Sequence, residues 1–316
     1  MINDTGRSIE KAATGRTSEP LVLMVVHAHP DDEAIGSGGI LRKYSNQGIR
    51  TVLVVATKGE AGEIDGRIPT DEERERIVDL RLEELECSRR ILGVQHVHFM
   101  GYRDSGMAGT PENKFPGAFA AADLEEAVGR LVQIIRRERP HVITTYNEKG
   151  TYGHPDHIMV NRVTVRAFED AGRSDRYPDQ DVSPWQPRKL YVQEIPLSRI
   201  RKLGEIMRSR AKQLDIDPES MGVVDDGITT WIDIRDVLSE KFAAIRCHKS
   251  QVGENSFFNQ FSKGQRVELF GFECFRWAAG QSKPKGRETD LFDGLRAHQV
   301  PQQTLGQGFS KGLGNP

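Results

Sequence analysis

The sequence predicts an α/β fold of the Rossmann-like type, in which a mostly parallel sheet carries helices on both faces. Short runs rich in Val and Ile alternate with longer segments in which apolar residues recur every three or four positions. The runs are continuously apolar, which is typical of parallel strands buried on both faces. This alternation ends near residue 175, and residues 176–280 predict an irregular α+β lobe that completes the sheet and the substrate pocket.

Four strands are expected in the first half of the chain. They are the apolar runs at residues 21–28, 51–57, 96–101 and 141–146. Each run is followed by a segment with helical periodicity. Because parallel strands need a long crossover between them, this order indicates successive β–α–β units.

Residues that favour helix ends delimit the expected helices. These helices are 33–46, 71–92, 123–138 and 156–171. Asp71 is placed to cap the second helix, and Gly93 follows its last residue. Pro140 stops the third helix, because proline cannot continue a helix.

Beyond residue 175 the elements are less regular. Strands are expected at 189–195 and 228–234, and helices at 197–214 and 237–247. Residues 254–278 contain six phenylalanines and Trp277. We expect this aromatic segment to cover one side of the core.

Both ends of the chain are polar, and they predict two segments outside the folded part. Residues 1–19 are expected to be disordered, and residues 281–316 to form an extended or disordered tail, because neither buries much apolar surface. Leu291 and Phe292 could dock locally. The predicted organisation places a metal-binding catalytic core at 20–175 and a C-terminal lobe at 176–280.

The composition excludes several classes of function. A net charge of −2 without a basic cluster argues against nucleic-acid binding. No apolar run is long enough to span a membrane or to serve as a secretory signal, so a cytoplasmic location is expected. The three cysteines, Cys87, Cys247 and Cys274, are far apart in the sequence. We expect them to be small core residues in a reducing compartment, without a disulfide framework.

Two similar polar segments follow the first and fourth expected strands. The first is His29-Pro30-Asp31-Asp32-Glu33, and the second is His154-Pro155-Asp156-His157. Each segment alone could be only a helix cap or a turn. Since the carboxyl ends of parallel strands meet at one edge of a sheet, we expect the two segments to converge there.

Their side chains predict a metal site. His29, Asp32 and His157 would supply two imidazoles and one carboxylate, which leaves a coordination position for water. One Zn²⁺ per chain suits this set, and Fe²⁺ is also accepted by it.

The remaining side chains of the two segments predict the catalytic groups. Asp31 would be free to act as general base. His154 could stabilise an oxyanion, and Asp156 could orient an imidazole from behind.

The glycines at positions 36–39 (GSGG) raise a different possibility, a nucleotide-binding oxidoreductase. The dinucleotide-binding fingerprint places its glycines directly between strand and helix. In this chain the segment HPDDE occupies that place, and the glycines lie inside the expected helix. Close packing of the helix is the favoured interpretation, and the oxidoreductase stays as an alternative from another class.

With AHPDDE (28–33) and GHPDH (153–157), the sequence resembles the zinc-dependent N-acetylglucosaminyl deacetylases, the LmbE-like or PIG-L-like family, over about residues 21–295. The resemblance implies the same metal, base and oxyanion roles for the residues named above. It further implies substrate contacts for Glu63, Arg81 and Asp104, with Tyr152 near the metal. Without the resemblance, Arg81 would be an exposed helix residue.

The resemblance also suggests the reaction. It implies an amidohydrolase that removes the acetyl group from an N-acetylglucosamine-containing small molecule, such as N-acetylglucosaminyl-inositol, by attack of a metal-activated water. Several stretches, among them RDSGMAGT (103–110) and ETDLFDGL (288–295), are similar to the mycothiol-pathway branch of the family. An amidase that cleaves the cysteinyl–glucosamine amide of a mycothiol S-conjugate is the alternative. Formation of a homo-oligomer is left open.

Overall fold

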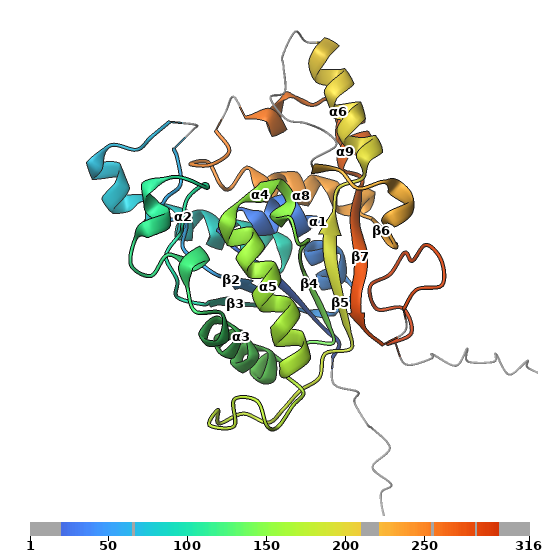
Figure 1. The fold of residues 1–316 in the computed structure, drawn as a ribbon. Helices are drawn as coiled ribbons and strands as arrows, with labels where there is room; N and C mark the ends of the chain where they lie inside the picture. Colours follow the sequence, from blue (N-terminus) through green and yellow to red (C-terminus); the bar gives the residue numbers. More distant parts are fainter. Residues whose placement is uncertain (1–19, 65–66, 210–220, 254–255, 282, 297–316) are drawn as a thin grey trace, which may run out of the picture.

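A seven-stranded sheet with the strand order β3-β2-β1-β4-β5-β7-β6 runs through the molecule (Figure 1). The computed structural model describes residues 20–296, apart from residues 65, 66, 210–220, 254, 255 and 282. The segment 1–19, which was expected to be disordered, lies outside the described residues.

Five strands form the parallel part of this sheet. They are β1 (Val22–His27), β2 (Arg50–Val55), β3 (His96–Phe99), β4 (Val142–Tyr146) and β5 (Lys189–Glu194). These five strands pair with one another in parallel, and β1 lies at their centre between β2 and β4. The predicted α/β fold with a mostly parallel sheet is therefore confirmed.

The other two strands run antiparallel to their neighbours. Strand β7 (Phe272–Gly280) lies between β5 and the edge strand β6 (Thr230–Asp233). Residues 254–278 were expected to cover one side of the core; Phe258 and Phe270 do pack against it, but residues 272–278 belong to the sheet itself. This strand was not predicted, because Glu273 and Arg276 interrupt its apolar pattern and charged residues are uncommon in the interior of a sheet. Long-range ion pairs of Glu273 with Lys241 and of Arg276 with Glu194 compensate their charges.

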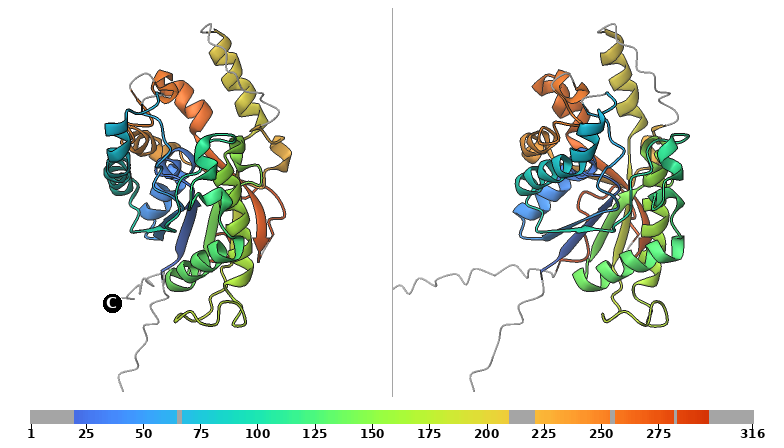
Figure 2. Two further views of the ribbon diagram at one scale, coloured as in Figure 1. Left: turned by 60° about the vertical axis from the view of Figure 1, so that its left-hand side comes forward. Right: turned by 90° about the vertical axis from the view of Figure 1, so that its left-hand side faces the viewer.

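Helices cover both faces of the sheet (Figure 2). One layer contains α1 (Asp32–Asn46), α2 (Asp71–Leu92) and α8 (Leu238–Ile245), and the other contains α3 (Leu124–Glu138) and α5 (Pro155–Asp170). Alternate residues of β1 point to opposite faces of the sheet and belong to two separate hydrophobic cores. Leu23 and Val25 pack with α1 and α8, whereas Val22, Met24 and Val26 pack with α3 and α5.

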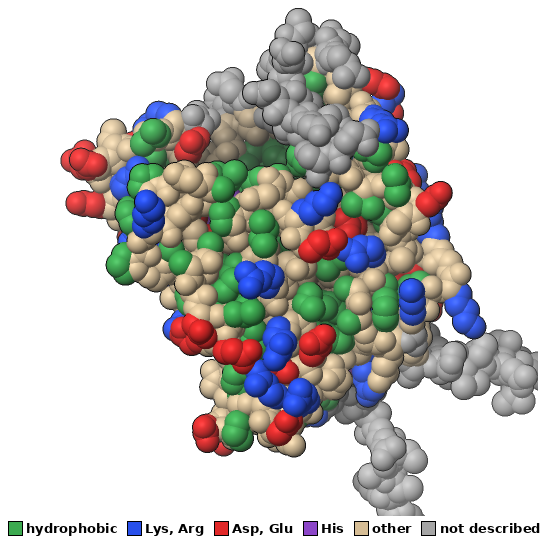
Figure 3. Space-filling view, in the orientation of Figure 1, with side chains coloured by type: hydrophobic (Ala, Val, Ile, Leu, Met, Phe, Trp, Pro, Cys, Tyr) green, Lys and Arg blue, Asp and Glu red, His purple; other side chains and the backbone are tan. Residues whose placement is uncertain are grey.

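Shorter elements complete the fold. They are α4 (Gly150–Gly153), α6 (Leu197–Ser209), α9 (Lys263–Phe270) and the 3₁₀ turns Pro111–Lys114, Phe119–Ala121, Asp225–Gly227, Arg235–Val237 and Phe257–Gln260. The helix expected at 197–214 begins at residue 197, and residues 210–214 lie outside the described part of the chain. Among the described residues, no helix is both long and apolar enough to cross a membrane. Charges of both signs are interspersed over the face in Figure 3.

The cap of α2 differs from the prediction. Thr70 is the N-cap residue, and its side chain and that of Glu73 form a reciprocal capping box, whereas Asp71 is the first helical residue. Gly93 ends the helix with a φ of 73°, as its position predicted.

A disulfide joins Cys87 of α2 to Cys247 just after α8, with a Cα–Cα distance of 5.8 Å. The expectation that all cysteines are unpaired core residues is therefore wrong for two of them. The two cysteines are 160 residues apart, and only the packing of α2 against α8 brings them together. Cys274 is free and buried, as expected.

The segment after β7 packs onto the fold. Leu291 and Phe292 are fully buried, and the ring of Phe292 lies 5.1 Å from that of Tyr44. Glu288 accepts hydrogen bonds from Lys189 Nζ (2.8 Å) and Tyr191 Oη (2.6 Å). The tail expected from residue 281 therefore does not include residues 288–295, and residues 297–316 lie outside the described part.

The glycines of α1 lie where other elements approach closely. A Cβ atom at Gly39 would lie 2.3 Å from Ile234 Cδ1 and 2.8 Å from Glu273 Oε1. The backbone N–H groups of Gly39 and Ile40 donate to the Glu273 carboxylate at 2.7 and 2.8 Å. Close packing, the favoured interpretation of the sequence, thus accounts for Gly39.

Candidate active site

The two HPD segments meet at the carboxyl edge of the sheet. Strands β1 and β4 are neighbours, so the loop after β1 lies beside the start of α5. The ring centroid of His29 is 4.6 Å from that of His154 and 5.4 Å from that of His157. Ring nitrogens of the three histidines lie within 4.8 Å of one another, and all three residues are buried.

Asp32 lies between two of these imidazoles. Its Oδ2 atom is 3.4 Å from His29 Nδ1 and 3.5 Å from His157 Nε2. Burial alone would raise the pKa of Asp32, but the two histidines outweigh it and hold the pKa well below its usual value. Asp32 is therefore an ionised carboxylate facing two ring nitrogens.

The two ring nitrogens of His157 are buried and are not satisfied by hydrogen bonds. Its ring stacks on Tyr146 with a centroid distance of 4.0 Å and an interplanar angle of 14°, which fixes the orientation of the ring. Because a buried polar atom without a partner is costly, a divalent cation between His157, Asp32 and His29 fits this arrangement.

The ring of His29 has carboxylates at both of its nitrogens. Its Nε2 atom lies 3.2 Å from Asp156 Oδ2 and 3.4 Å from Asp104 Oδ1. Its Nδ1 atom consequently faces Asp32. A carboxylate behind a ligating imidazole fixes both the tautomer and the orientation of the ring.

Asp156 is itself held firmly. It is fully buried in the first turn of α5 and accepts hydrogen bonds from the backbone N–H (2.9 Å) and the hydroxyl (2.5 Å) of Ser105. The orientation of His29 thus depends on the loop after β3, which contains Ser105.

His154 caps α5 and presents one nitrogen to the cluster. Its Nδ1 atom accepts the backbone N–H of Asp156 at 3.2 Å, so Nε2 is the nitrogen that carries the proton in the neutral ring. Burial, together with the neighbouring His29 and His157, lowers the pKa of His154 to about 4. His154 is therefore a neutral hydrogen-bond donor at pH 7.

Asp31 has an unusual backbone, with φ 124° and ψ −31°. Arg81 Nη2 lies 3.3 Å from its Oδ1 atom and also donates to the carbonyl of Pro30, while Nη1 donates to the carbonyl of Gly59. Burial raises the pKa of Asp31 to about 6; Arg81 opposes the rise and Asp32 adds to it. Arg81 is buried and braces the two loops around Asp31, so it is not the exposed residue that its helix pattern alone predicts.

The other expected substrate contacts lie in different environments. Asp104 is buried and accepts the backbone N–H of Gly106 at 2.8 Å. Tyr152 is half-exposed, with its ring 5.0 Å from that of His157. The Glu63 side chain is exposed and is not brought into the cluster by any hydrogen bond or ion pair among the described residues. The neighbouring Glu60 does reach the site region and accepts the backbone N–H of Asp104 at 3.0 Å.

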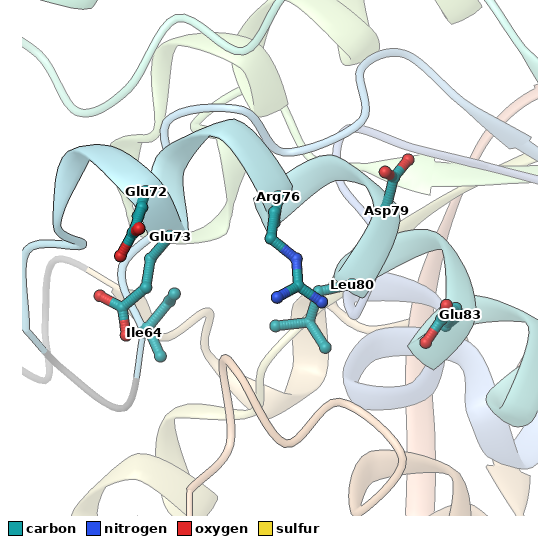
Figure 4. Close-up of a pocket in the computed structure, with 7 residues that line it drawn as sticks. All are labelled: Ile64, Glu72, Glu73, Arg76, Asp79, Leu80 and Glu83. Carbon is teal, nitrogen blue, oxygen red and sulfur yellow. The ribbon is translucent and has the colours of Figure 1, made fainter.

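A separate groove of about 630 Å³ runs along α2 (Figure 4). It is lined by Ile64, Glu72, Glu73, Arg76, Asp79, Leu80 and Glu83. It contains none of the residues predicted to bind metal or to catalyse. The candidate catalytic and metal-binding residues therefore lie at the strand ends, outside this groove.

Comparison with known proteins agrees with this geometry. The PIG-L model, described as GlcNAc-PI de-N-acetylase, matches residues 24–168, a range that includes both HPD segments. Two relatives named 1D-myo-inositol 2-acetamido-2-deoxy-alpha-D-glucopyranoside deacetylase are each 40% identical to the chain. The protein from Thermomonospora curvata aligns over 86% of this chain and 96% of its own length, and that from Acidothermus cellulolyticus over 88% and 96%. The chain belongs to the PIG-L family.

A solved structure supports the PIG-L fold. The N,N'-diacetylchitobiose deacetylase from Pyrococcus horikoshii, in complex with its inhibitor MPG, superimposes with a TM-score of 0.59 at 20% sequence identity. The match covers 82% of this chain and 84% of that protein. At this identity the likeness concerns the fold.

Several residues of the candidate site were not predicted. Tyr146 stacks on His157, Ser105 holds Asp156, and Glu33 and His248 form a buried pair beside Asp31. Tyr146 ends a predicted strand at the same edge, which is a signal that could have found it. No local pattern connects His248 with Glu33, which is 215 residues away.

Proposed function

We propose that the chain is a metal-dependent N-deacetylase that removes the acetyl group from an N-acetylglucosaminyl-inositol. The observation that carries the proposal is the convergence of His29, Asp32 and His157, with both ring nitrogens of His157 lacking hydrogen bonds. The names of the relatives support the substrate, since their deacetylase name specifies an acetamido-glucopyranoside of inositol.

The donor atoms suggest which metal would bind. His29 Nδ1, Asp32 Oδ2 and His157 Nε2 would hold one Zn²⁺, and the same set is compatible with Fe²⁺. When bound, the metal would supply Lewis acidity toward the acetyl carbonyl and would lower the pKa of water.

The remaining residues would carry the proton transfers and the charge. Asp31 takes a proton from the attacking water and then delivers it to the leaving amine of the sugar. The Nε2–H of His154 donates to the oxygen that becomes negative as the carbonyl carbon turns tetrahedral. Asp156 keeps His29 in the tautomer that leaves Nδ1 free.

Substrate contacts are assigned by accessibility. Tyr152 is half-exposed next to His154 and His157, so it can contact the sugar. Arg81 and Asp104 are buried against Asp31 and His29, so we assign them as contacts to a sugar hydroxyl at the inner end of the site. Glu63 is retained as a contact that requires its loop to bring the carboxylate inward.

The test is metal reconstitution with matched substrates. The metal-free protein would be supplied with Zn²⁺ or Fe²⁺, and acetate release from N-acetylglucosaminyl-inositol would be measured beside cleavage of a cysteinyl–glucosaminyl amide. We expect acetate release that depends on one equivalent of metal per chain. Cleavage of only the second substrate would favour the conjugate amidase. Turnover of neither substrate, or binding of NAD without stoichiometric metal, would contradict the proposal.

A further inference from the structure

We propose that Glu33 is a positioning residue that fixes the backbone of Asp31, and that Ser88 and His248 hold Glu33 for this purpose. The inference rests on the proposed function, because it assumes that Asp31 acts as the base.

The backbone of Asp31 needs such support. With φ 124° it adopts a conformation that residues with a Cβ atom rarely take. Its N–H donates to Glu33 Oε2 at 2.9 Å. This bond joins the strained residue to the first turn of α1, so the direction of the Asp31 side chain depends on where Glu33 lies.

Glu33 is in turn fixed by donors from two distant parts of the chain. Its Oε1 atom accepts hydrogen bonds from Ser88 Oγ (2.5 Å) and His248 Nε2 (2.7 Å). Glu33, Ser88 and His248 are all fully buried. All three hydrogen bonds are formed in only one orientation of the Glu33 carboxylate, so the carboxylate cannot rotate without losing some of them.

The disulfide ties the two donors together. Ser88 directly follows Cys87, and His248 directly follows Cys247. Helix α2 also supplies Arg81, which pairs with the carboxylate of Asp31. Helix α2 therefore holds Asp31 in two ways. Arg81 contacts its carboxylate directly, and Ser88 fixes Glu33, which in turn binds the backbone of Asp31.

The experiment compares His248→Leu, which removes the donor, with His248→Gln, which keeps an N–H donor. We expect kcat of His248→Leu to fall about 10- to 100-fold with KM and bound metal unchanged, as for other residues that orient catalytic groups. His248→Gln should return kcat to within about threefold of the wild-type value. A residue that only stabilises the fold would show neither the selective effect on kcat nor this rescue.

The matched control is Ser250→Ala. Ser250 lies two residues from His248 and bonds Glu84 across the same contact with α2, but it does not touch Glu33. We expect its kcat to stay within about twofold of wild type. If His248→Leu does not fold, Ser88→Ala and Glu33→Gln carry the same comparison, with lowered kcat and retained metal as the expected result.

The outcomes separate this inference from the proposed function. If Asp31→Asn is inactive while the His248→Leu and Ser88→Ala proteins keep wild-type kcat, the positioning role is wrong and the base assignment stands. Equal impairment of His248→Gln and His248→Leu would also overturn it, as would a loss of kcat in proportion to lost metal. Wild-type activity of Asp31→Asn would instead overturn the base assignment.

Discussion

Two clusters of histidine and carboxylate lie at opposite edges of the sheet. At the carboxyl ends of β1 and β4, His29 and His157 face Asp32. Near the amino ends of β2 and β3, His96 and His98 both lie within 3.0 Å of Glu138 Oε1. The residue types are almost the same, yet the environments differ.

The difference lies in which atoms already have partners. Glu138 also pairs with the guanidinium of Arg50, and both imidazoles are bonded to its carboxylate. In the first cluster, the buried nitrogens of His157 make no hydrogen bond. The two clusters thus contain similar residue types, but only the candidate metal site contains a histidine with both ring nitrogens buried and without a hydrogen bond.

The largest expected effect comes from removing equivalent histidines. We expect His157→Ala to lose the bound metal and to reduce kcat/KM by more than about 1000-fold, because several kcal/mol of transition-state stabilisation depend on the metal. His96→Ala should keep the metal and activity within about twofold. Metal analysis of the purified proteins and initial rates provide the measurement. Equal metal loss in both variants would break the comparison.

A smaller effect is expected at His154, which faces the candidate metal site but is not assigned as a ligand. His154→Ala should keep about one metal per chain but lower kcat by roughly 100- to 1000-fold, the usual consequence of losing one oxyanion donor. Loss of the metal in this variant would instead assign His154 as a ligand, since its ring lies within the same group of three histidines.

Asp156→Asn tests the support behind a ligand. We expect metal affinity to fall about 10- to 100-fold, because His29 loses the carboxylate that fixes its tautomer. Competition with a chelator of known affinity measures the change. Glu138→Gln is the matched control, and an equal decrease in affinity there would contradict the distinction between the two clusters.

The smallest effect concerns acid stability at the second cluster. Burial alone would raise the pKa of Glu138, but His96, Arg50 and His98 lower it to about 2. A lowered pKa means that the stabilisation is present above the usual carboxyl pKa and is lost as the pH falls from about 4.5 toward 2. Glu138→Gln should therefore be less stable than wild type near pH 6, and the difference in urea midpoint should narrow below about pH 4.5 and close near pH 2. A gap independent of pH would show that charge is not involved.

The sequence predicted those features that follow from strand order. Continuous apolar runs located the parallel strands, and the parallel arrangement was enough to place His29 and His157 at one edge. The candidate metal ligands could be predicted because they lie next to predicted strand ends. Local patterns therefore carried most of the parallel half of the fold.

Features that depend on partners distant in the sequence could not be predicted. Strand β7 contains Glu273, whose charge is balanced by Lys241 of α8. The helix pattern alone would place Arg81 on a solvated face, and only the family resemblance assigned it to the site; in the structure the loops after β1 and β2 fold over it. The exposed position of the Glu63 side chain depends on loop geometry that composition and spacing do not encode.

The docked segment at residues 288–295 has a consequence for biosynthesis. Lys189 is buried at the start of β5, and its carboxylate partner is Glu288, 99 residues later. Until that residue has left the ribosome, the lysine has no counter-charge and the space beside Tyr44 is not filled by Phe292. The interior of the fold is therefore completed only after residues 288–292 have been synthesised and have docked beside β5 and α1.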